Sequence, residues 1–375
     1  MSKIACFPAV KEVFGFGMMR LPMNGEEVDI PQTCEMVDAF LSAGFNYFDT
    51  AHGYIGGKSE LAVKACLTSR YPRDSYILTD KLSPNFFNTE EEIRPYFQSM
   101  LEACGVEYFD FFLLHSLTAG NYPHYTGNRA FEIAAELKAE GKVRHVGISF
   151  HDKADVLDRI LSEQPVIEVV QLQLNYLDYE DEGVQSRLCY EVCVKHGKPV
   201  IVMEPVRGGS LVNLPKEGLD VLNALGEYSP AGYALRYAAD FDNVFMVLSG
   251  MSNTEQMLDN IKSMKDAKPL TDEERAAVYR VADIIRAVPT IPCTGCKYCV
   301  DGDRCPMSIR IPSLFNVENK ARRFNTEDAR GHYGWVTSKG GKPADCIECG
   351  ACEEICPQQL PIRQLLKEIA ARFGE

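Results

Sequence analysis

Short β-rich runs and amphipathic stretches alternate along residues 1–265, and the pair is repeated eight times. The runs are rich in Val, Ile, Phe and Tyr and are bounded by Gly, Pro or Asp, which is typical of strands. Eight strand-then-helix units within about 250 residues predict a closed (β/α)8 TIM barrel of the α/β class. An open doubly wound sheet is the alternative, but that sheet usually has a Gly-x-Gly-x-x-Gly turn after its first strand. Residues 14–20 have too few glycines for that turn, so the barrel is favoured.

The individual elements follow from these runs and from the helical spacing between them. Strands are expected at Val13–Met18, Phe45–Asp49, Tyr76–Asp80, Phe109–His115, Val143–Ser149, Val166–Leu174, Pro199–Met203 and Val244–Leu248. Helices are expected at Pro31–Ala43, Ser59–Ser69, Thr89–Cys104, Arg129–Glu140, Lys153–Ser162, Gly183–His196, Pro230–Ala239, Thr254–Met264, Ile311–Arg323 and Pro361–Phe373. Gly44, Gly105, Gly141 and Gly197 each follow a predicted helix, as C-terminal stops do.

The segment after the eighth unit separates two regions of the chain. Residues 266–285 predict one more helix, which closes the barrel, and the link that follows contains Pro289 and Pro292. We therefore expect a barrel domain over residues 1–285 and a small C-terminal domain over residues 286–375.

Eight of the 14 cysteines lie in two short runs near the C-terminus. The first run is Cys293-x2-Cys296-x2-Cys299-x5-Cys305-Pro306, and the second is Cys346-x2-Cys349-x2-Cys352-x3-Cys356-Pro357. The two-residue spacing lets three consecutive thiolates reach three corners of one iron–sulfur cube from a single tight loop. The runs therefore predict two 4Fe-4S clusters and make the chain a carrier of single electrons.

The pattern of these runs resembles that of two-cluster ferredoxins, in which the fourth cysteine of each run ligates the other cluster. The resemblance implies a ferredoxin-like domain in which Cys356 joins the first three cysteines and Cys305 joins the second three. Two four-cysteine zinc sites are the alternative, although zinc usually takes pairs of cysteines separated by a long spacer. Disulfides are disfavoured because residues 1–10 do not have the pattern of a signal peptide, so we expect a cytoplasmic protein.

Charge and hydropathy limit the kinds of partner that we expect. The net charge of −14 is uneven, since residues 286–375 hold 13 basic and 11 acidic side chains whereas residues 1–285 carry −16. An acidic surface argues against nucleic-acid binding. The sequence has no apolar run of the ~18 residues that a membrane-spanning helix requires. This composition favours a small-molecule enzyme with an appended module.

Polar side chains follow several of the predicted strands, at the end of a TIM barrel where reactive residues belong. Reading those strand ends in order gives Asp49, then Tyr54 in the loop, Lys81 and His115. Their spacing, with the motifs Phe-Asn-Tyr-Phe-Asp-Thr-Ala-His-Gly-Tyr, Thr-Asp-Lys and Phe-Leu-Leu-His, resembles the catalytic tetrad of the aldo-keto reductases. The likeness covers roughly residues 10–265. With the C-terminal module, the chain resembles the iron–sulfur branch of that family.

These four residues suit the reduction of a carbonyl, which needs a hydride on carbon and a proton on oxygen. Tyr54 is expected to give the proton as general acid, and the ammonium group of Lys81 is expected to lower the tyrosine's pKa from about 10. Asp49 would keep Lys81 charged and oriented, and His115 would hydrogen-bond the carbonyl oxygen. A single buried Asp–Lys pair is more often structural, but four such groups at successive strand ends favour catalysis.

The resemblance also implies a nicotinamide site at the same end of the barrel. Ser149 and Gln171 are expected at the carboxamide, although the usual asparagine after that serine is Phe150 here. The resemblance and the glycine-containing loops after the seventh and eighth strands indicate further nucleotide contacts from Arg207, Gly208, Ser249, Gly250, Gln256, Asp259 and Asn260. Glu204 replaces the stacking tyrosine, and the positions of the family's 2′-phosphate cations are not basic. Both NADPH and NADH therefore stay open.

Taken together, these features predict an aldo-keto reductase-type oxidoreductase that reduces a carbonyl or oxidises an alcohol. Two clusters would relay its electrons to a one-electron partner such as ferredoxin. The loops Leu117–Asn128 and Gly209–Leu225 carry Tyr122, Tyr125 and few charges, which favours an apolar or aromatic substrate. One alternative is a ferredoxin-coupled reductase without nicotinamide, and another is a redox-sensing or electron-transfer protein with the barrel as scaffold. The clusters could also serve only to brace the fold.

Overall fold

The computed structural model describes residues 6–375, apart from the side chain of Asp328. The chain divides into two compact units. The first comprises Met1–Gly208 and Glu227–Val278, and the second comprises Gly209–Gly226 and Tyr279–Glu375. The domain boundary expected after residue 285 stays a prediction.

Eight parallel strands of the first unit form a closed barrel, in which β1 pairs with both β4 and β10. The strands are β1 (Phe14–Gly17), β4 (Tyr47–Asp49), β5 (Ile77–Leu82), β6 (Phe109–Leu117), β7 (Val143–Phe150), β8 (Val169–Gln173), β9 (Val200–Met203) and β10 (Val244–Gly250). The predicted TIM barrel is therefore confirmed, with every predicted strand present. A short antiparallel hairpin of β2 (Met23–Asn24) and β3 (Glu27–Val28) was not predicted.

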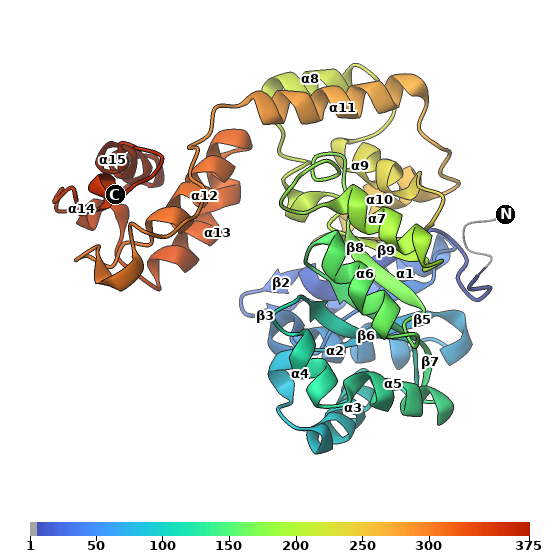
Figure 1. Cartoon of the computed structure of the whole chain (residues 1–375). Helices are drawn as coiled ribbons and strands as arrows, with labels where there is room; N and C mark the ends of the chain where they lie inside the picture. The colour runs from blue at the N-terminus through green and yellow to red at the C-terminus, as the bar shows by residue number, and fades with distance from the viewer. Residues whose placement is uncertain (1–5) are drawn as a thin grey trace. The chain divides into compact units, whose positions relative to one another are not determined.

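Helices surround this barrel, and most of them lie where the sequence predicts (Figure 1). They are α1 (Ile30–Ser42), α2 (Lys58–Val63), α3 (Glu90–Cys104), α4 (Tyr122–Gly127), α5 (Ala130–Ala139), α6 (Ala154–Glu163), α7 (Ser186–Lys195), α9 (Pro230–Ala239) and α10 (Thr254–Met264). The helix expected over residues 266–285 begins later, as α11 (Asp272–Ala287). Asp266 has a left-handed φ of 56° and Pro269 follows it, so the chain forms a loop before this helix starts.

The barrel strands are hydrophobic on both faces because helices cover their outer face and packed side chains fill their inner face. All six residues of β5 are buried, including the polar Thr79, Asp80 and Lys81. The interior is packed with aromatic and branched side chains, among them Tyr47 and Phe111. Gly147 makes room in this packing, since a Cβ there would lie 2.5 Å from the Val169 side chain.

Strand register sets the positions of the polar side chains at the C-terminal ends of the strands. Asp49 of β4 pairs with Thr79 of β5, two residues before Lys81. Ser149 at the end of β7 pairs with Gln171 of β8. Parallel strands end at the same rim of a barrel, so these side chains come from neighbouring strands at one rim.

The second unit is helical. It contains α8 (Lys216–Asn223), part of α11, α12 (Ile311–Arg323), α13 (Thr326–Thr337), α14 (Ala351–Glu354) and α15 (Ile362–Phe373). The predicted range of α12 is confirmed, whereas α13 was not predicted. The core of this unit is built from apolar residues of α12, α13 and α15, and the rings of Tyr333 and Phe373 stack with centroids 4.1 Å apart.

Within residues 6–375, none of the helices combines the length and the apolarity needed to cross a membrane.

Candidate active site and cluster-binding cavities

The four residues of the predicted tetrad come together at the C-terminal rim of the barrel. Asp49 ends β4, Lys81 lies in β5, His115 lies in β6, and Tyr54 begins the 3-10 turn Tyr54–Gly57. The ammonium nitrogen of Lys81 lies 2.6 Å from Asp49 Oδ1 and 3.2 Å from the Tyr54 hydroxyl. Its third hydrogen bond goes to the backbone oxygen of Thr50, at 2.8 Å. The three N–H groups of Lys81 are thus satisfied, and they hold Asp49 and Tyr54 in one hydrogen-bonded chain.

His115 lies beside the tyrosine of this chain. The Tyr54 and His115 rings meet edge to face, with centroids 5.9 Å apart. Nδ1 of His115 is hydrogen-bonded to Ser83 Oγ at 2.6 Å. Because Ser83 occupies Nδ1, Nε2 is the ring nitrogen that remains for a substrate oxygen. The Tyr125 hydroxyl donates to the backbone oxygen of His115 at 2.7 Å and steadies this strand end.

Burial dominates the electrostatics of the site. It raises the pKa of Tyr54, and the nearby ammonium of Lys81 opposes that rise without cancelling it. Lys81 lowers this pKa, as expected, but the desolvation of the phenol outweighs the ammonium, so the pKa of Tyr54 lies above its ordinary value. Burial and the positive charge of Lys81 lower the pKa of His115 to about 3, so its imidazole is neutral near pH 7. The site therefore offers a protonated phenol and a neutral imidazole.

Two of the residues predicted at the nicotinamide carboxamide adjoin this site. Gln171 donates from Nε2 to Asp49 Oδ2 at 3.2 Å, so its amide is anchored on the tetrad. Ser149 Oγ accepts a hydrogen bond from the backbone N–H of Ser116 at 2.7 Å. A cavity of about 470 Å³ lies at the ends of β7 and β8, where Phe150 and His151 are among its lining residues. Its other lining residues include Ser186 and Cys189 of α7, and the four tetrad residues are not among them.

The residues predicted at the phosphate and adenine end are held mainly by contacts within the protein. Arg207 donates from Nε to both carboxylate oxygens of Asp178, at 2.9 and 3.1 Å. Asn260 donates to Ser249 Oγ at 2.9 Å, and both side chains are buried. The remaining contacts are Gln256 Oε1 accepting from the Ser252 N–H at 2.8 Å and Asp259 accepting from the Ser229 hydroxyl at 2.5 Å.

Gly208 and Gly250 lie against a residue that sequence reasoning missed. A Cβ at Gly250 would lie 3.2 Å from Cβ of Arg20, and one at Gly208 would lie 3.3 Å from Arg20 Nη2. Arg20 follows β1 and therefore comes to these loops from the other end of the chain. Its sequence signal was weak, because a single arginine after a strand is not a motif.

The eight cysteines of the two runs line two separate cavities, each of about 330 Å³. One cavity is lined by Cys293, Cys296, Cys299 and Cys356, and the other by Cys305, Cys346, Cys349 and Cys352. Each run thus contributes its last cysteine to the other cavity, which is the crossed grouping that the resemblance to two-cluster ferredoxins implies. Four sulfurs around an otherwise apolar cavity fit a cubane cluster. Ile311 lines both cavities.

Comparison with known families agrees with both parts of this description. Residues 13–283 match the model of the Aldo/keto reductase family. The chain belongs to this family. Residues 292–360 match the model of a 4Fe-4S dicluster domain, so this aldo-keto reductase carries an iron–sulfur domain that follows the barrel along the chain.

Curated relatives of this aldo-keto reductase match it over the barrel. The NADH-specific methylglyoxal reductase of Escherichia coli (strain K12) is 26% identical over 61% of this chain and 82% of its own length. The L-galactose dehydrogenase of Arabidopsis thaliana is 26% identical over 60% of this chain and 76% of its own length.

Solved structures agree with the assignment. The holo form of aldo-keto reductase AKR11C1 from Bacillus halodurans superposes with a TM-score of 0.59 at 27% identity, covering 72% of this chain and 92% of its own. An aldo-keto reductase from Klebsiella pneumoniae in complex with NADPH superposes equally well, with a TM-score of 0.59 over 72% of this chain and 90% of its own. At 20% identity, this second likeness concerns the fold alone.

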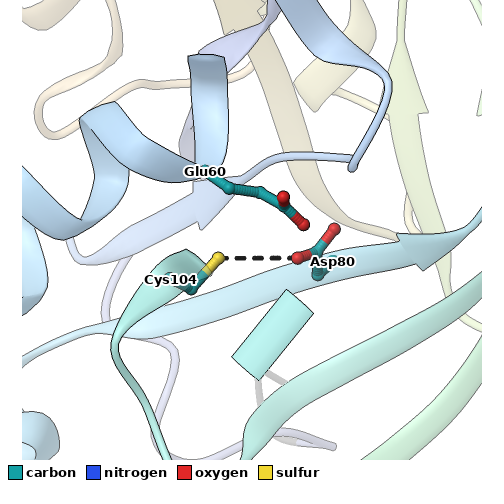
Figure 2. A group of neighbouring side chains, drawn as sticks. All are labelled: Glu60, Asp80 and Cys104. Atoms are coloured by element: carbon teal, nitrogen blue, oxygen red, sulfur yellow. Dashed lines mark hydrogen bonds between the residues drawn. The ribbon is translucent and has the colours of Figure 1, made fainter. Parts of the chain in front are cut away.

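A second group of ionisable side chains lies on the other face of β5 of the aldo-keto reductase barrel. Glu60, Asp80 and Cys104 come from α2, β5 and α3, and their ligand atoms all lie within 4.8 Å of one another (Figure 2). Cys104 Sγ donates to Asp80 at 3.5 Å, and His52 Nδ1 bonds Glu60 Oε2 at 2.8 Å. Burial and the neighbouring carboxylate raise the pKa of Asp80, and burial raises the pKa of Glu60 to about 7. A proton shared by the two carboxyl groups accounts for this cluster.

Proposed function

We propose that this aldo-keto reductase reduces a small carbonyl compound with a nicotinamide dinucleotide, and that two 4Fe-4S clusters exchange single electrons with a redox partner. The observation that carries the first part is the bonded chain Asp49–Lys81–Tyr54 beside His115 at the barrel rim. An isolated ion pair would not need a phenol and a neutral imidazole next to it. Together these groups supply what reduction of a carbonyl requires on its oxygen side.

Each residue has a separate task in the proposed reaction. His115 donates a hydrogen bond from Nε2 to the carbonyl oxygen and polarises it. Bound nicotinamide supplies the hydride to the carbonyl carbon. Tyr54 gives its hydroxyl proton to the carbonyl oxygen, so that the Tyr54 O–H bond breaks as the alcohol O–H bond forms. Lys81 stabilises the phenolate until water returns the proton, and Asp49 keeps Lys81 charged.

Residues at the same rim would hold the dinucleotide. Gln171 and Ser149 are proposed at the carboxamide, where Gln171 is already oriented by Asp49. The loops that contain Gly208 and Gly250, and the N-terminus of the 11-residue helix α10, are proposed at the phosphates and adenosine. The residues expected at the 2′-phosphate, Gly250 and Gln256, carry no positive charge, and Glu255 adds a negative one nearby. We therefore propose NADH rather than NADPH as the donor.

The two cysteine-lined cavities support the second part of the proposal. We propose that each holds one 4Fe-4S cluster, ligated by the four cysteines that line it. Loaded clusters supply one-electron chemistry, which a hydride donor alone does not. A ferredoxin or another one-electron protein is the partner that this chemistry implies.

A second candidate function is the reduction of a carbonyl without nicotinamide. Glu204 stands where the family has an aromatic residue that stacks on nicotinamide, and Arg207 is bonded to Asp178. Both features favour a site in which all electrons arrive through the clusters. Turnover that requires reduced ferredoxin and ignores NADH and NADPH would support this second function over the first.

Substitution of the proposed acid tests the reaction. We expect Tyr54→Phe to lower the turnover of a panel of small carbonyl compounds at least about 100-fold, because the substrate oxygen loses its proton donor. The exposed tyrosine of α11 offers a matched control, and Tyr279→Phe should leave turnover unchanged. Iron content and the visible absorbance of the clusters should be equal in all three proteins. Unchanged turnover in Tyr54→Phe would reject the proposed role of this residue.

A further inference from the structure

One of the two cysteine-lined cavities has an apolar side chain exposed at its rim. We call it the Cys349 cavity, and its cysteines are Cys305, Cys346, Cys349 and Cys352. Ile347 also lines this cavity and is 61% exposed, and Cys349 itself is exposed. In the described part of the chain, none of the exposed large apolar side chains lines the other cavity. Apolar surface is therefore open to solvent at the rim of the Cys349 cavity.

The only tryptophan of the chain is exposed between two cations. Trp335 lies in α13 and is 49% exposed. The guanidinium carbon of Arg310 lies 5.6 Å from the centre of a Trp335 ring, and the ammonium nitrogen of Lys339 lies 4.2 Å from a ring centre. Cations at these distances are attracted to the face of the indole. The two cations and the tryptophan therefore form one group on the surface of the domain.

The backbone fixes this group next to the Cys349 cavity. Arg310 lies between Ile309 and Ile311 in the sequence, and both isoleucines line that cavity. The turn that follows α13 is held against the same segment, because the N–H of Gly341 donates to the backbone oxygen of Ser308 at 3.1 Å. The tryptophan and its two cations thus border the segment that forms one wall of the cavity.

Three cations beside the cavity lack an acidic partner. Among residues 6–375, no ion pair is found for Arg304, which lines the Cys349 cavity, or for Arg310 or Lys339. By contrast, Arg363 lines the same cavity and pairs with Glu353 at 2.8 Å. The positive charge of the first three side chains is therefore available to a partner.

Balancing the charge of a cluster explains only one of these cations. A cluster held by four thiolates is anionic, so a cation that lines its cavity can balance it, and Arg304 does line the cavity. Arg310 and Lys339 line neither of the two cavities. An exposed aromatic and apolar surface with unpaired cations around it is typical of an interface that binds an acidic protein.

We infer that an acidic one-electron carrier protein docks on the surface formed by Arg304, Arg310, Trp335, Lys339 and Ile347, here called the Trp335 surface. The inference rests on the proposed function, because it names the docking surface and the charge of the proposed redox partner. Each encounter moves one electron from the reduced carrier to the cluster of the Cys349 cavity, and no bond forms or breaks. The cations steer the carrier, and the apolar side chains lie at the centre of the contact.

Reduction of the anaerobic, cluster-loaded protein by an acidic plant-type ferredoxin tests this inference, with reduced methyl viologen, a small cation, as the reference donor. We expect Arg310→Gln/Lys339→Gln to lower the second-order rate constant with ferredoxin about 10-fold at low ionic strength, because electrostatic steering is lost. The rate constant with viologen should change by less than about twofold, since this donor needs no docking surface. Added salt should slow the reaction of the wild type with ferredoxin much more than that of the variant.

Binding without electron transfer gives a second readout. In calorimetric titration with oxidised ferredoxin, we expect Arg310→Gln/Lys339→Gln to bind about 10-fold more weakly than the wild type. Trp335→Ala should also weaken binding, and its loss should persist in high salt because the contact is apolar.

The matched control also removes two exposed positive charges from the second unit. Lys216→Gln/Arg280→Gln changes α8 and α11, neither of which supplies a residue to the two cavities. The control should bind ferredoxin and accept its electron as the wild type does. Iron content should be equal in all of these proteins.

The outcomes separate this inference from the proposed function. If ferredoxin binds and reduces the wild type and Arg310→Gln/Lys339→Gln equally well, the inference is wrong and the proposed relay stands. If viologen reduces the wild type but ferredoxin does not, the acidic partner and the proposed relay to it are both rejected, and the reaction proposed for Tyr54 is untouched. A salt-sensitive dimer of the wild type that the variant abolishes would mean that a second copy of this chain, whose residues 1–285 carry −16, occupies the surface, and would overturn the inference.

Discussion

Two carboxyl groups are buried between the outer face of β5 and α2, and no cation is among the contacts described for them. Adjacent residues of a strand point to opposite faces, so Asp80 faces away from the barrel interior while Lys81 faces into it. Asp80 meets Glu60, which is 1% exposed, and the imidazole of His52 bonds Glu60 from the loop that also carries Tyr54 (Figure 2). The loop that carries Tyr54 therefore packs on a group whose charge depends on pH.

This arrangement predicts a dependence of stability on pH. Burial raises the pKa of Glu60 from 4.5 to about 7, so the folded state holds a proton that the unfolded state releases. The contribution of protonated Glu60 to the free energy of unfolding is then fully present below about pH 4.5. Up to about 3 kcal/mol of that contribution is lost as the pH rises towards 7. We expect Glu60→Gln to remove most of this slope. Thermal unfolding of the loaded protein between pH 5.5 and 8 measures it.

The control for this prediction is Glu217→Gln, at an exposed glutamate of α8. It should follow the wild type at every pH, including any loss that arises from the clusters. A Glu60→Gln variant whose melting temperature falls with pH as steeply as that of the wild type would show that Glu60 is not the titrating group.

At the scale of single residues, the sequence predicts which side chains form the candidate site but not their electrostatic properties. Asp49, Tyr54, Lys81 and His115 could be predicted because the end of each strand is visible in the pattern, and the fold brings strand ends together. The raised pKa of Tyr54 could not be predicted, because it depends on how deeply the phenol is buried. Burial of this kind is a property of the packed site and not of the residue order.

At the scale of the elements, the interior of the barrel allows little change in volume. Gly147 of β7 faces this interior, where a Cβ would lie 2.5 Å from a Val169 methyl, 2.6 Å from a Leu113 methyl and 2.7 Å from the Val169 backbone oxygen. A backbone atom cannot move aside as a side chain can. We expect Gly147→Ala to lower the free energy of unfolding by about 1–3 kcal/mol.

Denaturant unfolding measures this loss, with Gly127→Ala as the matched control. Gly127 ends α4, and a Cβ there would meet no atom within 4 Å. The control should unfold at the wild-type denaturant concentration or slightly above it. Equal stability of all three proteins would mean that β7 shifts freely, which contradicts the packing described for the barrel.

Helices and strands with a strong hydrophobic pattern were predicted well, whereas those with a weak pattern were missed. The eight strands and α12 follow from runs of β-branched or helically spaced apolar residues. The helix α13 was missed because Gly331 and Gly334 lower its helical propensity, and its packing on α12 is what stabilises it. The hairpin of β2 and β3 was missed because each strand has only two residues.

At the scale of the whole molecule, each of the two cysteine-lined cavities needs cysteines from both runs. The crossed grouping predicts that Cys305→Ser/Cys349→Ser damages one cavity and leaves the other with its four cysteines. That variant should keep about four iron atoms per chain, as one cubane cluster requires. Cys305→Ser/Cys296→Ser damages both cavities and should keep almost none. Iron and sulfide analysis after anaerobic reconstitution measures both.

An uncrossed arrangement predicts the reverse result, because Cys305 and Cys296 would then share a cluster. Cys6→Ser, at an exposed cysteine outside the runs, is the control and should keep the full iron content. The resemblance of the cysteine runs to those of two-cluster ferredoxins implied this grouping. It could not predict how electrons pass between the clusters and the barrel, which depends on distances in space.

The central claim is that the barrel reduces carbonyls through the phenol of Tyr54. Single-turnover mixing of cluster-loaded wild-type and Tyr54→Phe proteins with NADH and a carbonyl compound tests it most directly, with NADH and cluster absorbance followed together. We predict that the wild type consumes NADH and forms the alcohol, whereas Tyr54→Phe binds NADH but forms alcohol at least about 100-fold more slowly. Alcohol formed at the same rate by both proteins would contradict the claim.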